Sequence, residues 1–121
     1  LSTSGNGERG IVGAGRRRGH LLDPRTGEPA PDIGSLSVLA PDATSADGLS
    51  TGCYVLGPDE AFRRAAAEPE LALVVLEPAG RGLRARVSAG LRGRVRALVD
   101  DLTLELVAAP PAADVPTPSP R

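Results

Sequence analysis

The sequence predicts an α+β fold in which a mixed or antiparallel sheet carries helices packed on one face. Three observations predict it: short strand-like segments come first, two adjacent helical segments follow, and strand-like segments return. The regular strand–helix alternation of a dinucleotide-binding fold does not occur. The length favours one domain, here residues 1–107, with a Pro-rich tail at 108–121 that we expect to be disordered.

The first part of the chain predicts short strands joined by tight turns. Residues 1–5 resemble the end of a strand that runs into a glycine turn. Segments 8–12 and 17–22 flank Gly13-Ala14-Gly15, which is typical of a hairpin. The next segment, Asp23-Pro24-Arg25-Thr26-Gly27, has Asp and Pro at the positions that a type I turn favours.

The middle of the chain predicts one strand and two helices. Residues 35–40 (SLSVLA) alternate polar and apolar side chains, as a half-buried strand does. Asp42 or Thr44 can cap a helix that runs to about residue 56. Residues 58–67 predict a second helix, with Pro and two acids in its first turn. On a 3.6-residue repeat, the first helix places on one face Ala46, Leu49, Cys53 and Leu56.

The last part of the domain predicts a return to strands. Residues 71–76 (LALVVL) form a short apolar run that indicates a buried strand, and residues 83–87 are its expected hairpin partner. Residues 95–107 fit either a helix or a strand.

Composition excludes some classes of function. The formal net charge of −1 gives no overall attraction to nucleic acid or membranes, and the Arg16–Arg18 run has no interleaved aromatic residues for base stacking. The single cysteine, Cys53, cannot form an internal disulfide and is interpreted as a core residue. No apolar run is long enough to span a bilayer. Because the chain begins with Leu1, we expect a piece of a longer protein and leave its location open.

His20, the only histidine, stands directly before the predicted turn and has two interpretations. It either satisfies a turn carbonyl or acts as an acid, base or ligand near neutral pH. The interpretation of the turn residues is likewise left open. Asp23 can bond to its own turn, and Arg25 is either a solvated charge or a fork for a phosphate or carboxylate.

Asp47 and Thr51 are four residues apart, so they share one face of the first helix, which we place opposite the apolar face. A carboxylate and a hydroxyl suit a hard cation such as Mg²⁺, which keeps waters and takes further oxygens from a substrate phosphate. The alternative is a solvated surface pair. The Ser2-Thr3-Ser4-Gly5-Asn6 run can present N–H groups and hydroxyls to an anion, or it is an ordinary small-residue turn.

Four segments, in this order and spacing, resemble the C-terminal half of the ApbE family, the FAD:protein FMN transferases. The fold that the resemblance implies is ApbE-like and T-fold-like, and it is incomplete in this chain. The match covers about residues 1–77. The segments are STSGN at 2–6, GHLLDPRTG at 19–27, SVLAPDATSADGLST at 37–51 and YVLGPDEA at 54–61.

The resemblance implies a reaction and a site. The FMN part of FAD is attached through its phosphate to a threonine hydroxyl of a target protein, AMP leaves, and Mg²⁺ bridges the pyrophosphate. The family's metal ligands correspond to Asp47 and Thr51, and the histidine implicated in transfer corresponds to His20. The flavin-nucleotide contacts correspond to Ser2, Ser4, Gly5, His20, Asp23, Arg25 and Thr26.

The implied partners are FAD, an acceptor protein with a target Thr, the missing N-terminal half of the same domain and, optionally, a second copy of the chain. Nucleic acid is not among them. Family members are often exported and membrane-anchored. The competing hypothesis is a non-enzymatic, flavin-nucleotide-binding remnant, because half of the expected site lies outside this chain.

Overall fold

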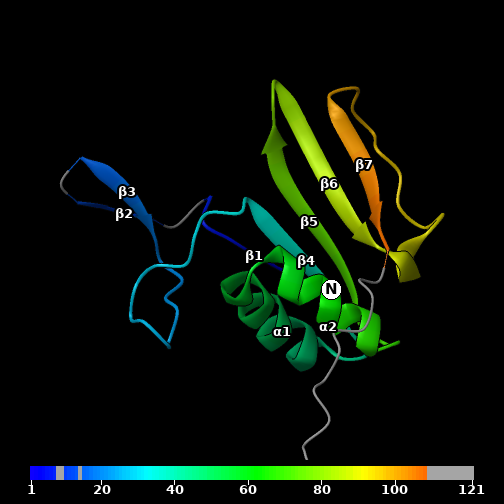
Figure 1. The fold of residues 1–121 in the computed structure, drawn as a ribbon, viewed down its shortest axis with the longest axis horizontal. Coiled ribbons are helices and arrows are strands. Elements are labelled where there is room, and N and C mark those ends of the chain that lie inside the picture. Colours follow the sequence, from blue (N-terminus) through cyan, green and yellow to red (C-terminus); the bar gives the residue numbers. More distant parts are fainter. Residues whose placement is uncertain (8–9, 14, 109–121) are drawn as a thin grey trace, which may run out of the picture.

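The computed structural model describes residues 1–7, 10–13 and 15–108. Its elements are β1 (Ser2–Gly5), β2 (Gly10–Gly13), β3 (Arg16–Gly19), β4 (Ser35–Leu39), α1 (Ala43–Leu56), α2 (Pro58–Ala67), β5 (Ala72–Ala79), β6 (Gly82–Ser88), the 3₁₀ turn η1 (Ala89–Leu91) and β7 (Leu102–Val107). A five-stranded sheet in the order β1-β4-β5-β6-β7 packs on α1 and α2, and the β2-β3 hairpin stands beside it (Figure 1). The predicted α+β class is confirmed. The predicted tail lies outside the described residues from 109 onward.

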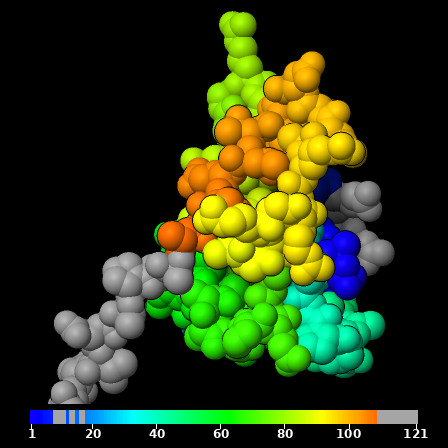
Figure 2. All heavy atoms as spheres, turned by 90° about the vertical axis from the view of Figure 1, so that its right-hand side faces the viewer, coloured from blue at the N-terminus to red at the C-terminus, as the bar shows by residue number. Residues whose placement is uncertain are grey.

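The sheet is mixed. Neighbouring strands from β1 to β6 run antiparallel, whereas β7 runs parallel to β6, with Leu83 opposite Leu102. The segment that fits either helix or strand therefore forms a strand in its second half, and residues 92–101 form neither. A parallel pair requires the chain to return along the sheet, which this connection does. Figure 2 shows the connection and β7, yellow to orange, at the surface of this edge.

Two apolar clusters lie on opposite faces of β5, which explains why its sequence is apolar at successive positions. Leu73 and Val75 belong to the larger cluster, beneath the helices, together with Leu36, Val38 and Phe62. Val74 and Leu76 pack against the smaller cluster of Ala85, Val87 and Leu91.

The buried face of α1 differs from the predicted one. Leu56 is 40 % exposed, so the predicted face was wrong at that position. The helix turns instead toward Tyr54, because burying this ring removes a larger apolar area from water. Asp47 and Thr51 consequently border the buried face next to β1 and do not lie opposite it. The buried residues of α1 are Ala46, Ser50, Cys53 and Tyr54.

Asp42 caps α1, which decides between the two predicted caps. Its carboxylate accepts hydrogen bonds from the Ser45 backbone N–H at 2.9 Å and from the Ser45 hydroxyl at 2.6 Å. We expect Asp42→Ala to lower the free energy of unfolding by about 1 kcal/mol, the usual cost of removing an N-cap. Urea unfolding measures this change. Thr44→Ala is the matched control and is expected to cost nothing; equal losses in the two variants would contradict the assignment.

The β2-β3 hairpin places His20 directly after a close contact with the sheet. A Cβ on Gly19 would lie 2.3 Å from Nδ2 of Asn6, which follows β1 and is buried, so a larger residue here would require the Asn6 side chain to shift. The predicted turn is confirmed: the Thr26 and Gly27 N–H groups both donate to the Asp23 carbonyl, at 3.2 and 2.7 Å. His20 thus lies between two ordered features.

Candidate functional site

Hydroxyl groups join β1 to α1. The Ser2 hydroxyl donates to Oδ1 of Asp47 at 3.1 Å, and the Ser4 hydroxyl lies 3.1 Å from Oγ1 of Thr51. The contacts follow from alternation, since residues 2 and 4 of a strand share a face and residues 47 and 51 of a helix share a face. Four residues predicted from the sequence therefore meet at one seam, which we call the β1–α1 seam.

Ser50 lies in the middle of this seam and was missed by the sequence analysis. It is fully buried, and its hydroxyl lies 2.9 Å from that of Ser4 and 3.3 Å from that of Ser2, and donates to the Asp47 carbonyl at 2.9 Å. A buried polar group is usually retained with its hydrogen-bond partners. The sequence signal that could have identified Ser50 is its spacing, since it stands four residues after Ala46 and therefore on the same buried side of the helix.

One cleft of about 880 Å³ opens beside the seam, where β4 and β6 begin and β5 ends. His20, Asp47 and Thr51 all line it, so the structure brings together the three residues predicted for transfer and metal binding. Gly5 lines it as well, and Ser2 reaches it through Asp47. The polar lining side chains include Thr3, Ser4, His20, Asp32, Asp47 and Thr51.

One wall of the cleft is apolar. Leu76 and Pro78 come from β5 and Leu83 from β6, and Leu21 adds a further apolar side chain next to His20. Side chains of these elements alternate between the faces of the sheet, which brings Leu76 and Leu83 to the same side. The cleft can therefore hold a ligand that has both a polar and an apolar part.

The charge of the cleft restricts its ligands. Asp32 and Asp47 contribute carboxylates, and no arginine occurs among the described residues that line the cleft. A phosphate ligand here would be repelled unless a cation accompanied it. Asp47 and Thr51 offer oxygen atoms of the type that a hard cation prefers. Within residues 1–7, 10–13 and 15–108, no group of three or more His, Cys, Asp or Glu forms a complete metal shell.

The predicted turn contacts lie elsewhere. Asp23, Arg25 and Thr26 do not line the cleft. Arg25 donates from Nη2 to Oδ2 of Asp23 at 2.6 Å and from its backbone N–H to Oδ1 at 2.9 Å. These bonds lower the pKa of the Asp23 carboxyl to about 2. Thr26 accepts the Glu28 N–H at 3.2 Å. The three side chains thus hold the turn together, and their contact with a ligand stays a prediction.

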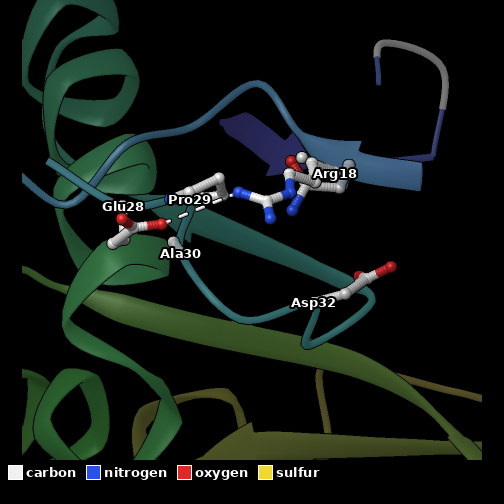
Figure 3. Close-up of a pocket in the computed structure, with 7 residues that line it drawn as sticks. Arg18, Glu28, Pro29, Ala30 and Asp32 are labelled. Carbon is white, nitrogen blue, oxygen red and sulfur yellow. Dashed lines mark ion pairs between the residues drawn. The ribbon is translucent and has the colours of Figure 1, made fainter. Parts of the chain in front are cut away.

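A smaller cavity of about 360 Å³ lies between β3 and residues 28–32. Figure 3 shows Arg18 reaching from β3 toward Glu28, with Nη1 3.8 Å from Oε2, while Asp32 lies on the other side of the view. Both members of this ion pair are more than half exposed, so it contributes little to stability. Asp32 is the charged residue that lines both cavities.

The fold and the cleft define an α+β domain that has an acidic, hydroxyl-lined site between one end of a sheet and a helix. The chain belongs to the ApbE family, whose sequence profile matches residues 1–75. This confirms the family that the sequence analysis identified, and the four segments that carried the resemblance lie within the matched residues.

Two curated relatives are each named FAD:protein FMN transferase. The one from Treponema pallidum is 39 % identical over 85 % of this chain and 28 % of the relative, and the one from Klebsiella pneumoniae is 37 % identical over 76 % and 26 %. The crystal structure of the ApbE protein from Thermotoga maritima matches with a TM-score of 0.63 and 33 % identity, over 79 % of this chain and 31 % of that one. The flavinyl transferase ApbE from Pseudomonas stutzeri, in its apo form, matches with a TM-score of 0.60.

The chain spans less than a third of the length of these relatives. Among the described residues, no helix is long and apolar enough to cross a membrane.

Proposed function

We propose that residues 1–107 are the C-terminal part of a Mg²⁺-dependent FAD:protein FMN transferase, and that residues 108–121 are a tail outside the domain. The enzyme moves FMN from FAD to a threonine hydroxyl of an acceptor protein and releases AMP. The observation that carries the proposal is the cleft that His20, Asp47 and Thr51 line together. The names of the relatives support the same reaction.

The cleft has the size and the two chemical walls that a flavin nucleotide needs. Its volume of about 880 Å³ falls among those of ligand sites. The apolar wall of Leu76, Pro78 and Leu83 suits a planar ring system, and the seam suits a diphosphate accompanied by a cation. Asp47 and Thr51 would hold Mg²⁺, which when bound neutralises charge on the diphosphate oxygens.

His20 is proposed as the base. The acceptor threonine Oγ forms a bond to the FMN phosphorus, and the bond from that phosphorus to the bridging oxygen breaks. The electron pair and the bridging oxygen leave with AMP, and the threonine proton moves to the imidazole of His20. Thr26, Asp23 and Arg25 are proposed to position the backbone that follows His20, since their bonds hold the turn.

The remainder of the site is proposed to come from a preceding N-terminal segment of the same protein, because the chain spans less than a third of its relatives. FAD and the acceptor protein are then the functional partners. A second copy of the chain is a further partner in this proposal. The non-enzymatic binding remnant is the alternative, and the short span of the chain is what favours it.

One assay separates the two functions. The full-length protein that carries this chain is incubated with FAD, Mg²⁺ and a threonine-containing acceptor protein from the same organism. We expect AMP and a flavin-labelled acceptor in equal amounts. Binding of FAD without AMP release would favour the remnant, and no binding of FAD would contradict both functions.

We expect His20→Ala to reduce transfer about 100- to 10,000-fold while FAD still binds, because a positioned base contributes that much. The rate is measured as AMP release and binding as quenching of flavin fluorescence. His20→Gln is the matched variant that keeps a polar side chain and is expected to be as slow. Transfer at the parental rate in either variant would remove His20 from the proposed mechanism.

A further inference from the structure

Asp32 lies on the wall that separates the two cavities. It shares the main cleft with His20 and Asp47, and it shares the smaller cavity with Arg18 and Glu28. It is exposed to solvent, and Figure 3 shows it with the residues that line the smaller cavity. The sequence analysis gave it no role, and the proposed reaction leaves it unused.

The orientation of the Asp32 carboxylate is fixed through one of its oxygens. Oδ1 accepts the Gly34 N–H at 3.0 Å and the Tyr54 hydroxyl at 3.3 Å. No hydrogen bond to Oδ2 occurs within the part of the chain that the structure describes. An ionised carboxylate is only an acceptor, so Oδ2 can take a hydrogen bond from a ligand.

Tyr54 connects this carboxylate to the helix of the site. It is 1 % exposed and stands three residues after Thr51 in α1. Its hydroxyl accepts the Ile33 N–H at 3.4 Å and donates to Asp32. Burial raises the pKa of Tyr54, so the hydroxyl keeps its proton near neutral pH. The helix that carries Asp47 and Thr51 thus also holds the loop that carries Asp32.

We infer that Asp32 is a substrate-binding residue whose Oδ2 accepts a hydrogen bond from a hydroxyl or N–H group of the flavin nucleotide, and that Tyr54 positions it. The inference rests on the proposed function. A phosphate oxygen cannot be the partner, because two acceptors repel each other.

Asp32→Asn tests the binding role. In the variant, the amide oxygen can keep both hydrogen bonds that Oδ1 accepts. The amide NH₂ group then replaces Oδ2, so a donor faces the donor of the ligand. We expect the KM for FAD to rise about tenfold, because the variant loses a hydrogen bond to a charged group. We expect kcat to stay within about twofold of the parental value, because the lost contact acts in binding. Glu28→Gln, a carboxylate change confined to the smaller cavity, is the control and is expected to leave both constants unchanged.

Two inhibitors locate the donor on the ligand. FMN carries the ribityl hydroxyls and the ring N–H, whereas ADP carries the ribose hydroxyls and the adenine amino group. A tenfold weaker inhibition by FMN alone, or by ADP alone, in Asp32→Asn supports the inference and identifies the half that is recognised. If FMN and ADP inhibit Asp32→Asn as they inhibit the parent protein, and the KM for FAD is also unchanged, the inference about Asp32 is overturned. The proposed function is then still supported, provided that the parent protein transfers FMN. A parent protein that neither binds FAD nor transfers FMN overturns both.

Tyr54→Phe tests the positioning role, because it removes only the hydroxyl. We expect a rise of about three- to tenfold in the KM for FAD and little further rise when it is combined with Asp32→Asn, since both changes act on one contact. A merely structural role would reduce the amount of active protein, which lowers kcat and leaves KM alone. That result, or fully additive effects of the two substitutions, would overturn the positioning role.

Discussion

Replacing Asp47 with alanine is expected to reduce Mg²⁺-dependent transfer about 1,000-fold or more. In the proposed site this carboxylate is the only charged protein ligand from the chain, and its position beside Thr51 and Ser2 follows from the β1–α1 seam. A divalent cation supplies several kcal/mol of stabilisation to charge that develops on a phosphoryl group, and about 4 kcal/mol corresponds to this factor in rate. AMP release at a series of Mg²⁺ concentrations measures the loss.

The choice of control separates metal binding from general damage. Asp59→Asn removes a carboxylate from α2 that pairs with Arg86 at 3.0 Å and does not line the cleft. It is expected to transfer FMN at the parental rate. The fold of Asp47→Ala should also survive, because its lost bond to Ser2 lies at the surface. Equal rates for Asp47→Ala and the parent protein in excess Mg²⁺ would show that Asp47 is not a ligand.

The sequence predicted those features that depend on local signals. Asp42 and the Gly57-Pro58 pair set the two ends of α1, and both were predictable because a cap and a helix-ending dipeptide act within a few residues. The alternation of residues 35–39 likewise indicates one buried and one half-buried face, as β4 shows. His20, Asp47 and Thr51 were found through motifs, and their common cleft required the packing of β1 on α1.

Features that depend on contacts between distant segments were not predictable. The direction of α1's buried face is set by Tyr54, whose hydroxyl finds partners at residues 32 and 33. Ser50 is buried only because two serines of β1 meet it. β7 pairs in parallel with β6 because the connection between them, whose only regular element is the 3₁₀ turn η1, returns along the sheet. The periodicity within residues 95–107 carries no information on this pairing.

Replacing Gly34 with alanine is expected to have the largest effect on stability, a loss of about 3 kcal/mol or more in the free energy of unfolding. Gly34 has a φ of 83°, a region that costs a residue with a Cβ about 1–2 kcal/mol. The added Cβ would also lie 2.2 Å from the backbone carbonyl oxygen of Leu76, the residue that pairs with Ser35 in the sheet. Either the β4–β5 pairing or the loop that carries Asp32 must move, so the KM for FAD should rise as well.

A glycine-to-alanine substitution at another position should change the free energy of unfolding in the opposite direction. Gly48 lies inside α1, where an added Cβ meets nothing within 4 Å. Gly48→Ala should therefore raise the free energy of unfolding by about 0.8–1 kcal/mol through helix propensity alone. Urea unfolding of the two variants and the parent protein measures both changes. Because the chemical change is identical, opposite shifts can arise only from the positions, and a Gly34→Ala variant as stable as the parent would show that the loop before β4 adopts another conformation.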